Sequence, residues 1–253
     1  RMYAEERQQE ILQTVEHEGR VSVSALAQRF AVATETIRRD LDTLSSLGLL
    51  TRVHGGAIPS RSDEEPDLPT RLSTNTAAKR RIALAASAFL PSGTKPTVLV
   101  DAGSTTTELV PHLADRGLRI VTNALPVAEA ALALGTVDIE IPPGSVRGLT
   151  HAAVGVDTVR ALSRIHPDVA FIGCNGMGPD GITTPDPDEA ATKSAMVRAA
   201  SRCIVVADSS KAGQRQLVTF AELGEIDVLV SDTSLSDAHV SLFEDNGIEV
   251  VRA

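Results

Sequence analysis

A composition typical of phosphate-binding loops occurs in the run Asp101-Ala102-Gly103-Ser104-Thr105-Thr106-Thr107. The run follows the apolar segment 97–100, and a strand, a small-residue loop and a helix start in that order point backbone N–H groups toward an anion. The helix dipole favours negative charge, and the hydroxyl groups add hydrogen-bond donors. The alternative is an ordinary strand-to-helix turn with a Ser or Thr cap, and the local residues fit both interpretations equally. Asp101, Gly103, Ser104, Thr105 and Thr106 are the candidate ligand residues of this loop.

Polar residues also follow four later apolar segments. Ligands of open α/β sheets bind outside the carboxyl ends of the strands, so we expect these residues beside the same loop. Arg147 and Lys211 would supply positive charge for a phosphate dianion. For any single lysine, a solvated surface position is the alternative. The candidates at these strand ends are Thr122, Asn123, Gly144, Arg147, Asn175, Gly176, Asp208 and Lys211.

A second constellation lies near the N-terminus, on a helix predicted over residues 34–47. Its apolar face consists of Ile37, Leu41, Leu44 and Leu47. Arg39 lies nearly opposite this face and Arg38 on its flank, which suits a helix that enters the DNA major groove. The alternative is a solvated helix on which the two arginines pair with Glu35 and Asp42.

The elements around this helix predict a winged helix-turn-helix domain over residues 1–58. A helix over 5–18 ends at Gly19, Ser22 caps a second helix, and Gly48 ends the third. A β-hairpin over 49–58 follows, with its tip at Gly55-Gly56. We expect DNA contacts from Thr34, Thr36, Arg38, Arg39, Arg52, His54 and Gly55.

Residues 59–75 contain three prolines and few apolar residues, which predicts a linker. A helix over 76–90 then precedes strands and helices in alternation, so domain 76–253 is predicted to be α/β, with an open, largely parallel sheet covered on both faces. The strands are expected at 97–101, 118–122, 137–141, 168–172, 203–207, 226–231 and 248–252. The helices are expected at 105–115, 124–134, 152–164, 187–200 and 235–246.

Composition restricts the class of protein. The net charge is −9, while the first 61 residues carry eight Arg and eight acidic residues, so DNA binding requires a local arginine cluster. The two cysteines, Cys174 and Cys203, read as small buried hydrophobes, and no Cys/His cluster has zinc spacing. No segment reaches the roughly 18 apolar residues of a membrane helix, and residues 1–6 contain no apolar signal region. We expect a soluble, cytoplasmic protein without metal, cofactor or membrane contact.

The sequence resembles the DeoR family of bacterial repressors. The resemblance is carried by Thr36-Ile37-Arg38-Arg39-Asp40-Leu41 and Arg52-Val53-His54-Gly55-Gly56-Ala57 at this separation, and it continues through nearly the whole chain. It implies a winged-helix domain that binds operator DNA, a homo-oligomer (dimer or tetramer), and release from DNA when a sugar phosphate binds. It also implies a C-terminal domain similar to ribose-5-phosphate isomerase and glucosamine-6-phosphate deaminase.

The resemblance adds further ligand residues, Lys79 and Lys193, which match family positions. His151 precedes a segment similar to the family's ligand-side Val-Gly element and could hydrogen-bond a sugar hydroxyl; a polar loop residue is the alternative. Glu189 is either the remnant of an isomerase acid/base or, as we prefer, a helix N-terminal acid favoured by the dipole. No catalytic residue is assigned.

Two positions depart from the family pattern. The family has Ser or Thr as the cap of the recognition helix, whereas this chain has Ala33 followed by Thr34. Either Thr34 replaces the cap or the cap is missing, at a cost of about 1 kcal/mol. Pro143 replaces the first Gly of a Gly-Gly-x-x-Arg motif, which removes one backbone donor and fixes φ.

Three functions compete. The first is a transcriptional repressor of sugar-metabolism genes that is controlled by a phosphorylated sugar. Fructose 1-phosphate or fructose 6-phosphate is the specific expectation, because the stretches 147–152 and 189–196 look most like regulators of fructose and phosphotransferase sugar genes. The second is a sugar-phosphate isomerase or deaminase with an accessory DNA-binding domain, which requires a carboxylate base and an acid/base partner. The third is a constitutive architectural DNA binder, which leaves the strand-end polar residues without a role.

Overall fold

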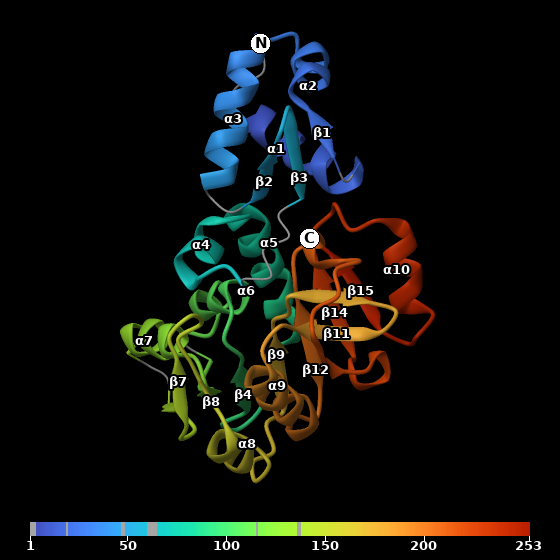
Figure 1. Cartoon of the computed structure of the whole chain (residues 1–253). Helices are drawn as coiled ribbons and strands as arrows, with labels where there is room; N and C mark the ends of the chain where they lie inside the picture. The colour runs from blue at the N-terminus through green and yellow to red at the C-terminus, as the bar shows by residue number, and fades with distance from the viewer. Residues whose placement is uncertain (1–3, 19, 47–48, 60–64, 115, 136–137) are drawn as a thin grey trace. The chain divides into compact units, whose positions relative to one another are not determined.

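The computed structural model describes residues 4–18, 20–46, 49–59, 65–114, 116–135 and 138–253. The chain divides into two compact units, Arg1–Pro66 and Asp67–Ala253, and each is described by itself (Figure 1). The predicted residues Gly19, Leu47 and Gly48 lie outside the described residues.

The first unit is a winged helix-turn-helix. Its elements are α1 (Ala4–Glu18), β1 (Val21–Ser22), α2 (Val23–Phe30), α3 (Thr34–Ser46), β2 (Leu50–Val53) and β3 (Gly56–Pro59). The three strands pair antiparallel in the order β1-β3-β2. The two-residue β1 was not predicted, because a segment this short carries no periodicity. The helices enclose an aliphatic core that includes Ile11, Leu26, Ile37 and Leu41.

The hairpin tip lies one residue earlier than predicted. The turn is formed by His54 and Gly55, and Gly55 has a φ of +78°, a conformation that glycine adopts at little cost. Gly56 already belongs to β3, where it pairs with Val53 and Ser22. A Cβ at Gly56 would lie 1.9 Å from the carbonyl oxygen of Val21, so close backbone approach explains this second glycine.

The second unit is built on a seven-stranded parallel sheet. Its order is β15-β14-β12-β9-β4-β5-β6, and every neighbouring pair is parallel. The strands are β4 (Thr97–Val100), β5 (Arg119–Thr122), β6 (Asp138–Glu140), β9 (Val169–Ile172), β12 (Cys203–Val206), β14 (Val228–Ser231) and β15 (Glu249–Arg252). All seven predicted strands are therefore confirmed.

Both faces of this sheet are buried. Successive residues of β4 enter two different cores: Val98 and Val100 pack with Ile82 of one helical layer, whereas Leu99 packs with Met196 of the other. The layers contain α5 (Thr76–Ala86), α6 (Ser104–Thr107), α7 (Leu125–Ala133), α8 (Val156–Leu162), α9 (Pro187–Ala199) and α10 (Asp237–Glu244). This two-sided burial requires the continuous aliphatic runs seen in the sequence.

Two predicted helices and the linker need correction. The helix expected at 105–115 is reduced to α6 and a 3₁₀ turn at Val110–His112, since Pro111 and the run of threonines do not support a long helix. The first residues of the helix expected at 152–164 form β8 (Ala152–Val154), which pairs with β7 (Ser145–Arg147) before Gly155 opens α8.

The predicted linker of 59–75 extends too far. Residues Leu68–Ser73 form helix α4 of the second unit, capped by Asp67 and anchored by the buried Leu68. The sequence also did not predict a small antiparallel sheet of β10 (Gly176–Gly178), β11 (Gly181–Thr184) and β13 (Val218–Ala221). Within the described residues, no helix is both long and apolar enough to cross a membrane.

Candidate functional site

Helix α3 separates its side chains as a recognition helix requires. Ile37, Leu41 and Leu44 are buried against the core of the first unit. Arg38 and Arg39 are exposed, and so is Thr34, while Thr36 is partly exposed. Arg38 Nη1 lies 3.3 Å from Glu35 Oε2, so one of the two ion pairs of the alternative interpretation is present. That pair is solvent-exposed and is worth little, so it leaves Arg38 available for a phosphate or a guanine edge.

The start of α3 settles the question of its cap. The helix begins at Thr34, and the carbonyl oxygen of Ala33 accepts hydrogen bonds from the amides of Thr36 and Ile37. Ala33 therefore occupies the N-cap position, and its methyl side chain cannot accept a hydrogen bond. The side-chain cap of the family is missing here, at a cost of about 1 kcal/mol.

A buried ion pair, which the sequence analysis did not assign, joins α3 to α1. Arg7 Nε lies 2.6 Å from Asp40 Oδ2 and Arg7 Nη2 lies 3.1 Å from Asp40 Oδ1, so one edge of the guanidinium donates to both carboxylate oxygens. Gln8 donates a further hydrogen bond to Asp40. The hydrogen bond from Arg7 to Asp40 raises the pKa of the arginine further. Because two hydrogen bonds join α3 to α1 here, we expect this pair to restrict the rotation of α3 about its own axis, and hence the direction in which Arg39 points.

The hairpin of β2 and β3, which is the wing of this domain, contacts the same helix. Arg52 Nε of β2 lies 3.1 Å from Asp42 Oδ1 of α3, so Asp42 pairs with the wing rather than with Arg39. His54 and Gly55 are exposed at the hairpin tip. Within the first unit, the predicted DNA-binding residues therefore lie on one exposed helix and on the hairpin attached to it.

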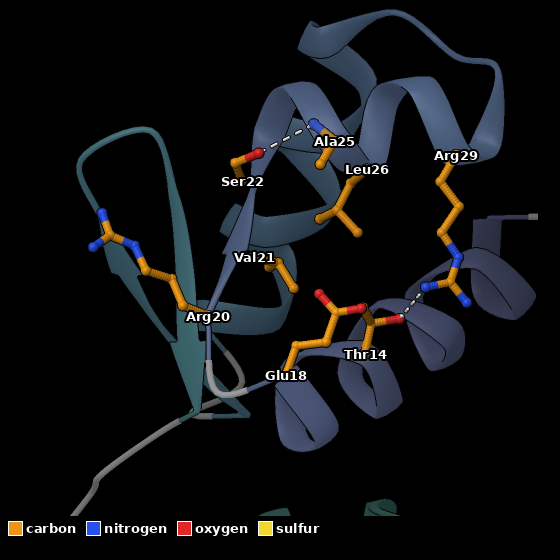
Figure 2. A pocket seen from close by; sticks show the side chains of 8 residues that line it. All are labelled: Thr14, Glu18, Arg20, Val21, Ser22, Ala25, Leu26 and Arg29. Carbon is orange, nitrogen blue, oxygen red and sulfur yellow. Dashed lines mark hydrogen bonds between the residues drawn. The ribbon is translucent and has the colours of Figure 1, made fainter.

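The first unit also contains a hollow of about 350 Å³ away from these residues (Figure 2). It lies between α1 and α2, where Arg29 Nη1 donates to Thr14 Oγ1 and Ser22 Oγ accepts from the amide of Ala25. Its lining is Thr14, Glu18, Arg20, Val21, Ser22, Ala25, Leu26 and Arg29. None of the residues predicted to bind DNA is among them.

In the second unit, Asp101 is the centre of a buried polar group. Its side chain forms an ion pair with Lys193 of α9 and accepts a hydrogen bond of 3.0 Å from the amide of Gly173. Lys193 also donates to the carbonyl oxygen of Gly173, at 3.1 Å. These contacts connect the carboxyl ends of β4 and β9 with α9, as predicted for ligand sites of open sheets.

The small-residue loop after β4 is shaped by its own threonines. Thr106 Oγ1 lies 2.7 Å from the carbonyl oxygen of Asp101 and 2.9 Å from that of Gly103, and Thr107 Oγ1 donates to the same Gly103 oxygen. Ser104 and Thr105 are buried at the start of α6. The Thr106 hydroxyl hydrogen is therefore used inside the loop, where it holds the backbone of residues 101–106 in place.

A cluster of cations lies at the end of β12. Burial lowers the pKa of Lys79 to about 8, opposed by Asp208 and assisted by the positive charges of Lys211 and Arg71. Lys79 Nζ donates to the carbonyl oxygen of Arg71, and Asn75 Nδ2 donates to Asp208 Oδ1 over 3.1 Å. Arg71 was not predicted, because it fell within the presumed linker.

Cys174 lies close enough to connect this cation cluster with the Asp101 group. The charges of Lys211, Lys193, Asp208 and Asp101 all act on its thiol. Burial raises the pKa of Cys174 to about 12 and also raises that of Cys203 in β12. Both cysteines are free thiols that stay protonated at neutral pH.

Arg147 is engaged by carboxylates. It lies 3.3 Å from Asp186 Oδ2 and 3.3 Å from Glu189 Oε1, and Thr150 donates to the same Glu189 oxygen. Glu189 and Lys193 are four residues apart on α9 and so lie on one face of that helix. The contacts of Arg147 and those of Asp101 therefore lie next to each other along α9. The charge of Arg147 is compensated by Asp186 and Glu189.

The remaining predicted ligand residues lie in several environments. Thr122 and Asn123 are buried after β5, where Asn123 Nδ2 donates to the carbonyl oxygen of Ala153 and its Oδ1 is buried without a partner among the described residues. Asn175 accepts from Thr184, and a Cβ at Gly176 would lie 2.4 Å from the carbonyl oxygen of Gln214, so close packing explains that glycine. Gly144 and His151 are exposed in the segments around β7.

No group of three or more His, Cys, Asp or Glu side chains in the described ranges is arranged to hold a metal ion. Lys79 and Lys193 instead donate to the backbone carbonyl oxygens of Arg71 and Gly173, and with Lys211 they form a positively charged group whose chemistry suits an anion.

Comparisons with known proteins match both units of the chain to domains of one family. A family model of the DeoR-like helix-turn-helix domain matches residues 7–62, and a model of the DeoR C terminal sensor domain matches residues 74–233. The HTH-type transcriptional regulator GlpR of Haloferax volcanii is 34% identical over 99% of this chain and 98% of its own. The Glycerol-3-phosphate regulon repressor of Escherichia coli is 33% identical over 92% of this chain and 95% of its own.

Solved structures are similar in fold alone. A chain of the tetrameric eIF2B-beta2-delta2 complex from C. thermophilum has a TM-score of 0.50 and 12% identity, over 96% of this chain and 88% of that chain. Ribose 5-phosphate isomerase A from Methanocaldococcus jannaschii has a TM-score of 0.40 and 14% identity over 55% of each chain, which carries no conclusion about activity.

The winged helix joined to a parallel α/β unit defines a two-domain, DNA-binding transcription regulator. The chain belongs to the DeoR family of transcriptional repressors.

Proposed function

We propose that this repressor changes its hold on operator DNA when a phosphorylated sugar binds at the carboxyl ends of β4, β9 and β12. One observation carries the proposal: Lys79, Lys193 and Lys211 come from distant parts of the chain, and their charges lie around Asp101 and Asp208 at the carboxyl ends of these strands. Lysine side chains gathered in this way can bind a phosphate by charge-assisted hydrogen bonds.

The sugar class is supported by the printed names of relatives. They include a repressor of the glycerol-3-phosphate regulon and a regulator called FruR from Bacillus subtilis, which is 33% identical over 91% of this chain and 92% of its own. Fructose 1-phosphate and fructose 6-phosphate remain the first effectors to test, with glycerol 3-phosphate beside them. The proposed assembly is a homo-oligomer, dimer or tetramer, whose paired recognition helices match two operator half-sites.

The experiment is a gel-shift titration of the full chain on its own promoter DNA. Each phosphorylated compound is added over a concentration series, with the unphosphorylated sugar as the matched control. We expect at least one phosphate ester to change operator affinity about tenfold or more while its parent sugar has no effect. If none of the esters alters either the gel shift or the melting temperature, the proposed sensing function is wrong.

The enzyme hypothesis is disfavoured by the environment of Glu189. An acid/base carboxylate must reach a substrate proton, whereas Glu189 accepts hydrogen bonds from Thr150 and Arg147 at the start of α9. Because of this environment, catalysis forms no part of the proposal. Turnover of ribose 5-phosphate or glucosamine 6-phosphate above background would support the enzyme hypothesis instead.

A further inference from the structure

We propose that Asp232 is a positioning residue of the sensor site: it holds the turn that carries Lys211 and so determines where this lysine meets a phosphorylated ligand. The inference rests on the proposed function, because it concerns the same site. The sequence analysis selected no residue at the end of β14, the strand that Asp232 follows.

The turn that carries Lys211 is short. Residues Ser209–Lys211 form a single 3₁₀ turn after β12, in which the amide of Lys211 donates to the carbonyl oxygen of Asp208 over 3.1 Å. Hydrogen bonds of 3₁₀ turns have poor geometry, and such turns add little stability of their own. The place of Lys211 therefore depends on the groups that anchor the turn from outside.

Two carboxylates anchor this turn from adjacent strands. Asp208, after β12, accepts at Oδ1 from the amide of Ser210 over 3.2 Å and from Asn75 Nδ2 over 3.1 Å. Asp232, after β14, accepts from the amide of Ser209 over 2.7 Å and from the Ser209 hydroxyl over 2.9 Å. Because β12 and β14 pair in parallel, both anchors come from the same edge of the sheet.

The environment of Asp232 suits a fixed anchor. Its side chain is buried, at 4% exposure, and its Oδ1 also accepts from the amide of Ser234 over 2.9 Å. Burial raises the pKa of Asp232, but the hydrogen bonds from Ser209 and Ser234 outweigh this effect and hold the pKa below its ordinary value. These donors are neutral N–H and O–H groups, so they order the turn without using the charge of Lys211.

Lysine benefits from such an anchor more than most residues. Its ammonium group is a point charge on a flexible stem, so its direction toward a phosphate depends on where the backbone of the turn is held. Lys211 is partly exposed, and its charge acts both on Lys79 and on the thiol of Cys174. Residues that touch a ligand keep a binding geometry only when hydrogen bonds support them from behind, and Asp232 provides this support.

The test is a double-mutant cycle on the full chain. Calorimetric titrations use inorganic phosphate, fructose 1-phosphate, fructose 6-phosphate and glycerol 3-phosphate. Asp232→Asn replaces one acceptor oxygen with an NH₂ group that cannot accept from Ser209, and Lys211→Met removes the charge. We expect about a tenfold loss of affinity for each single variant and less than a twofold further loss for the double variant, because Asp232 acts through Lys211.

A matched control lies at the other end of the same strand. Asp227 directly precedes β14, and its Oδ2 accepts from the amide of Cys203 at the start of β12 over 2.7 Å. Asp227→Asn and Asp232→Asn each remove a carboxylate that joins these two strands, so both should lower the melting temperature. Only Asp232→Asn should weaken phosphate binding, whereas Asp227→Asn should change it less than twofold.

A milder variant keeps the test decisive if Asp232→Asn does not fold. Ser209→Ala removes only the hydroxyl donor and leaves the amide bond to Asp232 in place. It should give a smaller loss of affinity that also disappears in the Lys211→Met background.

The outcomes distinguish this inference from the proposed function. Unchanged affinity in Asp232→Asn or in Lys211→Met, with the wild-type chain binding normally, overturns the inference and leaves the proposed function standing. Losses that add in the double variant, or an equal loss in Asp227→Asn, assign Asp232 a general structural role and also overturn the inference. Failure of every phosphate probe to bind the wild-type chain overturns both.

Discussion

Each unit contains a buried ion pair, but the cations of the two pairs differ. The DNA-binding unit pairs Arg7 with Asp40, and the sensor unit pairs Lys193 with Asp101. The guanidinium of Arg7 grips its partner through two nitrogens and so fixes two helices in one relative orientation. The ammonium of Lys193 is a rotatable point charge that divides its donors between Asp101 and a backbone carbonyl. The first pair suits a surface that must keep one shape, and the second suits a site whose partners change when a ligand enters.

The largest expected effect is the loss of Asp40. Asp40→Ala leaves the Arg7 guanidinium buried without its carboxylate, which should destabilise the first unit by about 3–5 kcal/mol and abolish operator binding. Calorimetric melting and a gel shift measure the two effects, and phosphate-ester affinity should be unchanged. Glu35→Ala, which removes the exposed partner of Arg38, is the control and should cost less than about 0.5 kcal/mol.

A double variant sharpens the assignment of this pair to positioning. Arg7→Met combined with Asp40→Leu fills the same space with apolar side chains and should recover most of the stability. If the pair also orients α3, operator affinity stays low even though the unit is folded. Full recovery of operator affinity would show that the pair contributes stability alone.

The next effect belongs to the sensor pair. Lys193→Met leaves the Asp101 carboxylate buried and should cost about 3 kcal/mol in the sensor unit. We expect the effector response to disappear while operator binding persists. In a gel-shift titration, the variant should therefore stay bound to operator DNA at every effector concentration. Adding Asp101→Asn should restore stability without restoring the response. A double variant that responds normally would contradict a ligand-side role for this pair.

The contrast between the two units also explains what the sequence could predict. The seven parallel strands were found because each is a short, continuous aliphatic run, and Ile37, Leu41 and Leu44 were found by helical periodicity. Strands β7, β8 and β10 have only three residues each, too few for any period to show. Helix α4 was missed because prolines at 66 and 69 suggested a linker, although Asp67 in fact caps the helix and Pro69 lies in its first turn.

The partner of a charged side chain was harder to predict from the sequence than the face of the helix on which that side chain lies. Asp40 is three residues from Ile37 and therefore lies on the buried face of α3, so a charge in the core could have been recognised from the sequence. Its partner, 33 residues earlier, could not, because periodicity gives orientation and not pairing. The same holds for Arg147, whose carboxylate partners lie on a helix that begins about 40 residues later.

A smaller effect is expected from pH. Burial holds the pKa of Lys79 at about 8, below its value in the unfolded chain. Below pH 8 the lysine is charged and able to bind a phosphate dianion; above it the charge is lost, so affinity should fall up to tenfold per pH unit. Stability of the sensor unit should change in the opposite sense and rise between pH 8 and the unfolded pKa, because there the unfolded chain binds more protons. Titrations at pH 7, 8, 9 and 10 test both trends, and Lys79→Met should abolish them, whereas Lys95→Met, at an exposed turn, should not.

The smallest effect concerns the missing cap of α3 and can only strengthen the DNA-binding unit. Ala33→Ser places a hydroxyl where it can accept from the amide of the second or third helical residue, which should stabilise the first unit by about 1 kcal/mol. Because the first turn of α3 carries Thr34 and Thr36, which we predict to contact DNA, operator affinity should rise slightly as fraying falls. Ala33→Gly is the control, since it lacks a side-chain acceptor. If serine raises the melting temperature without changing operator affinity, the first turn of α3 is already ordered before it meets DNA.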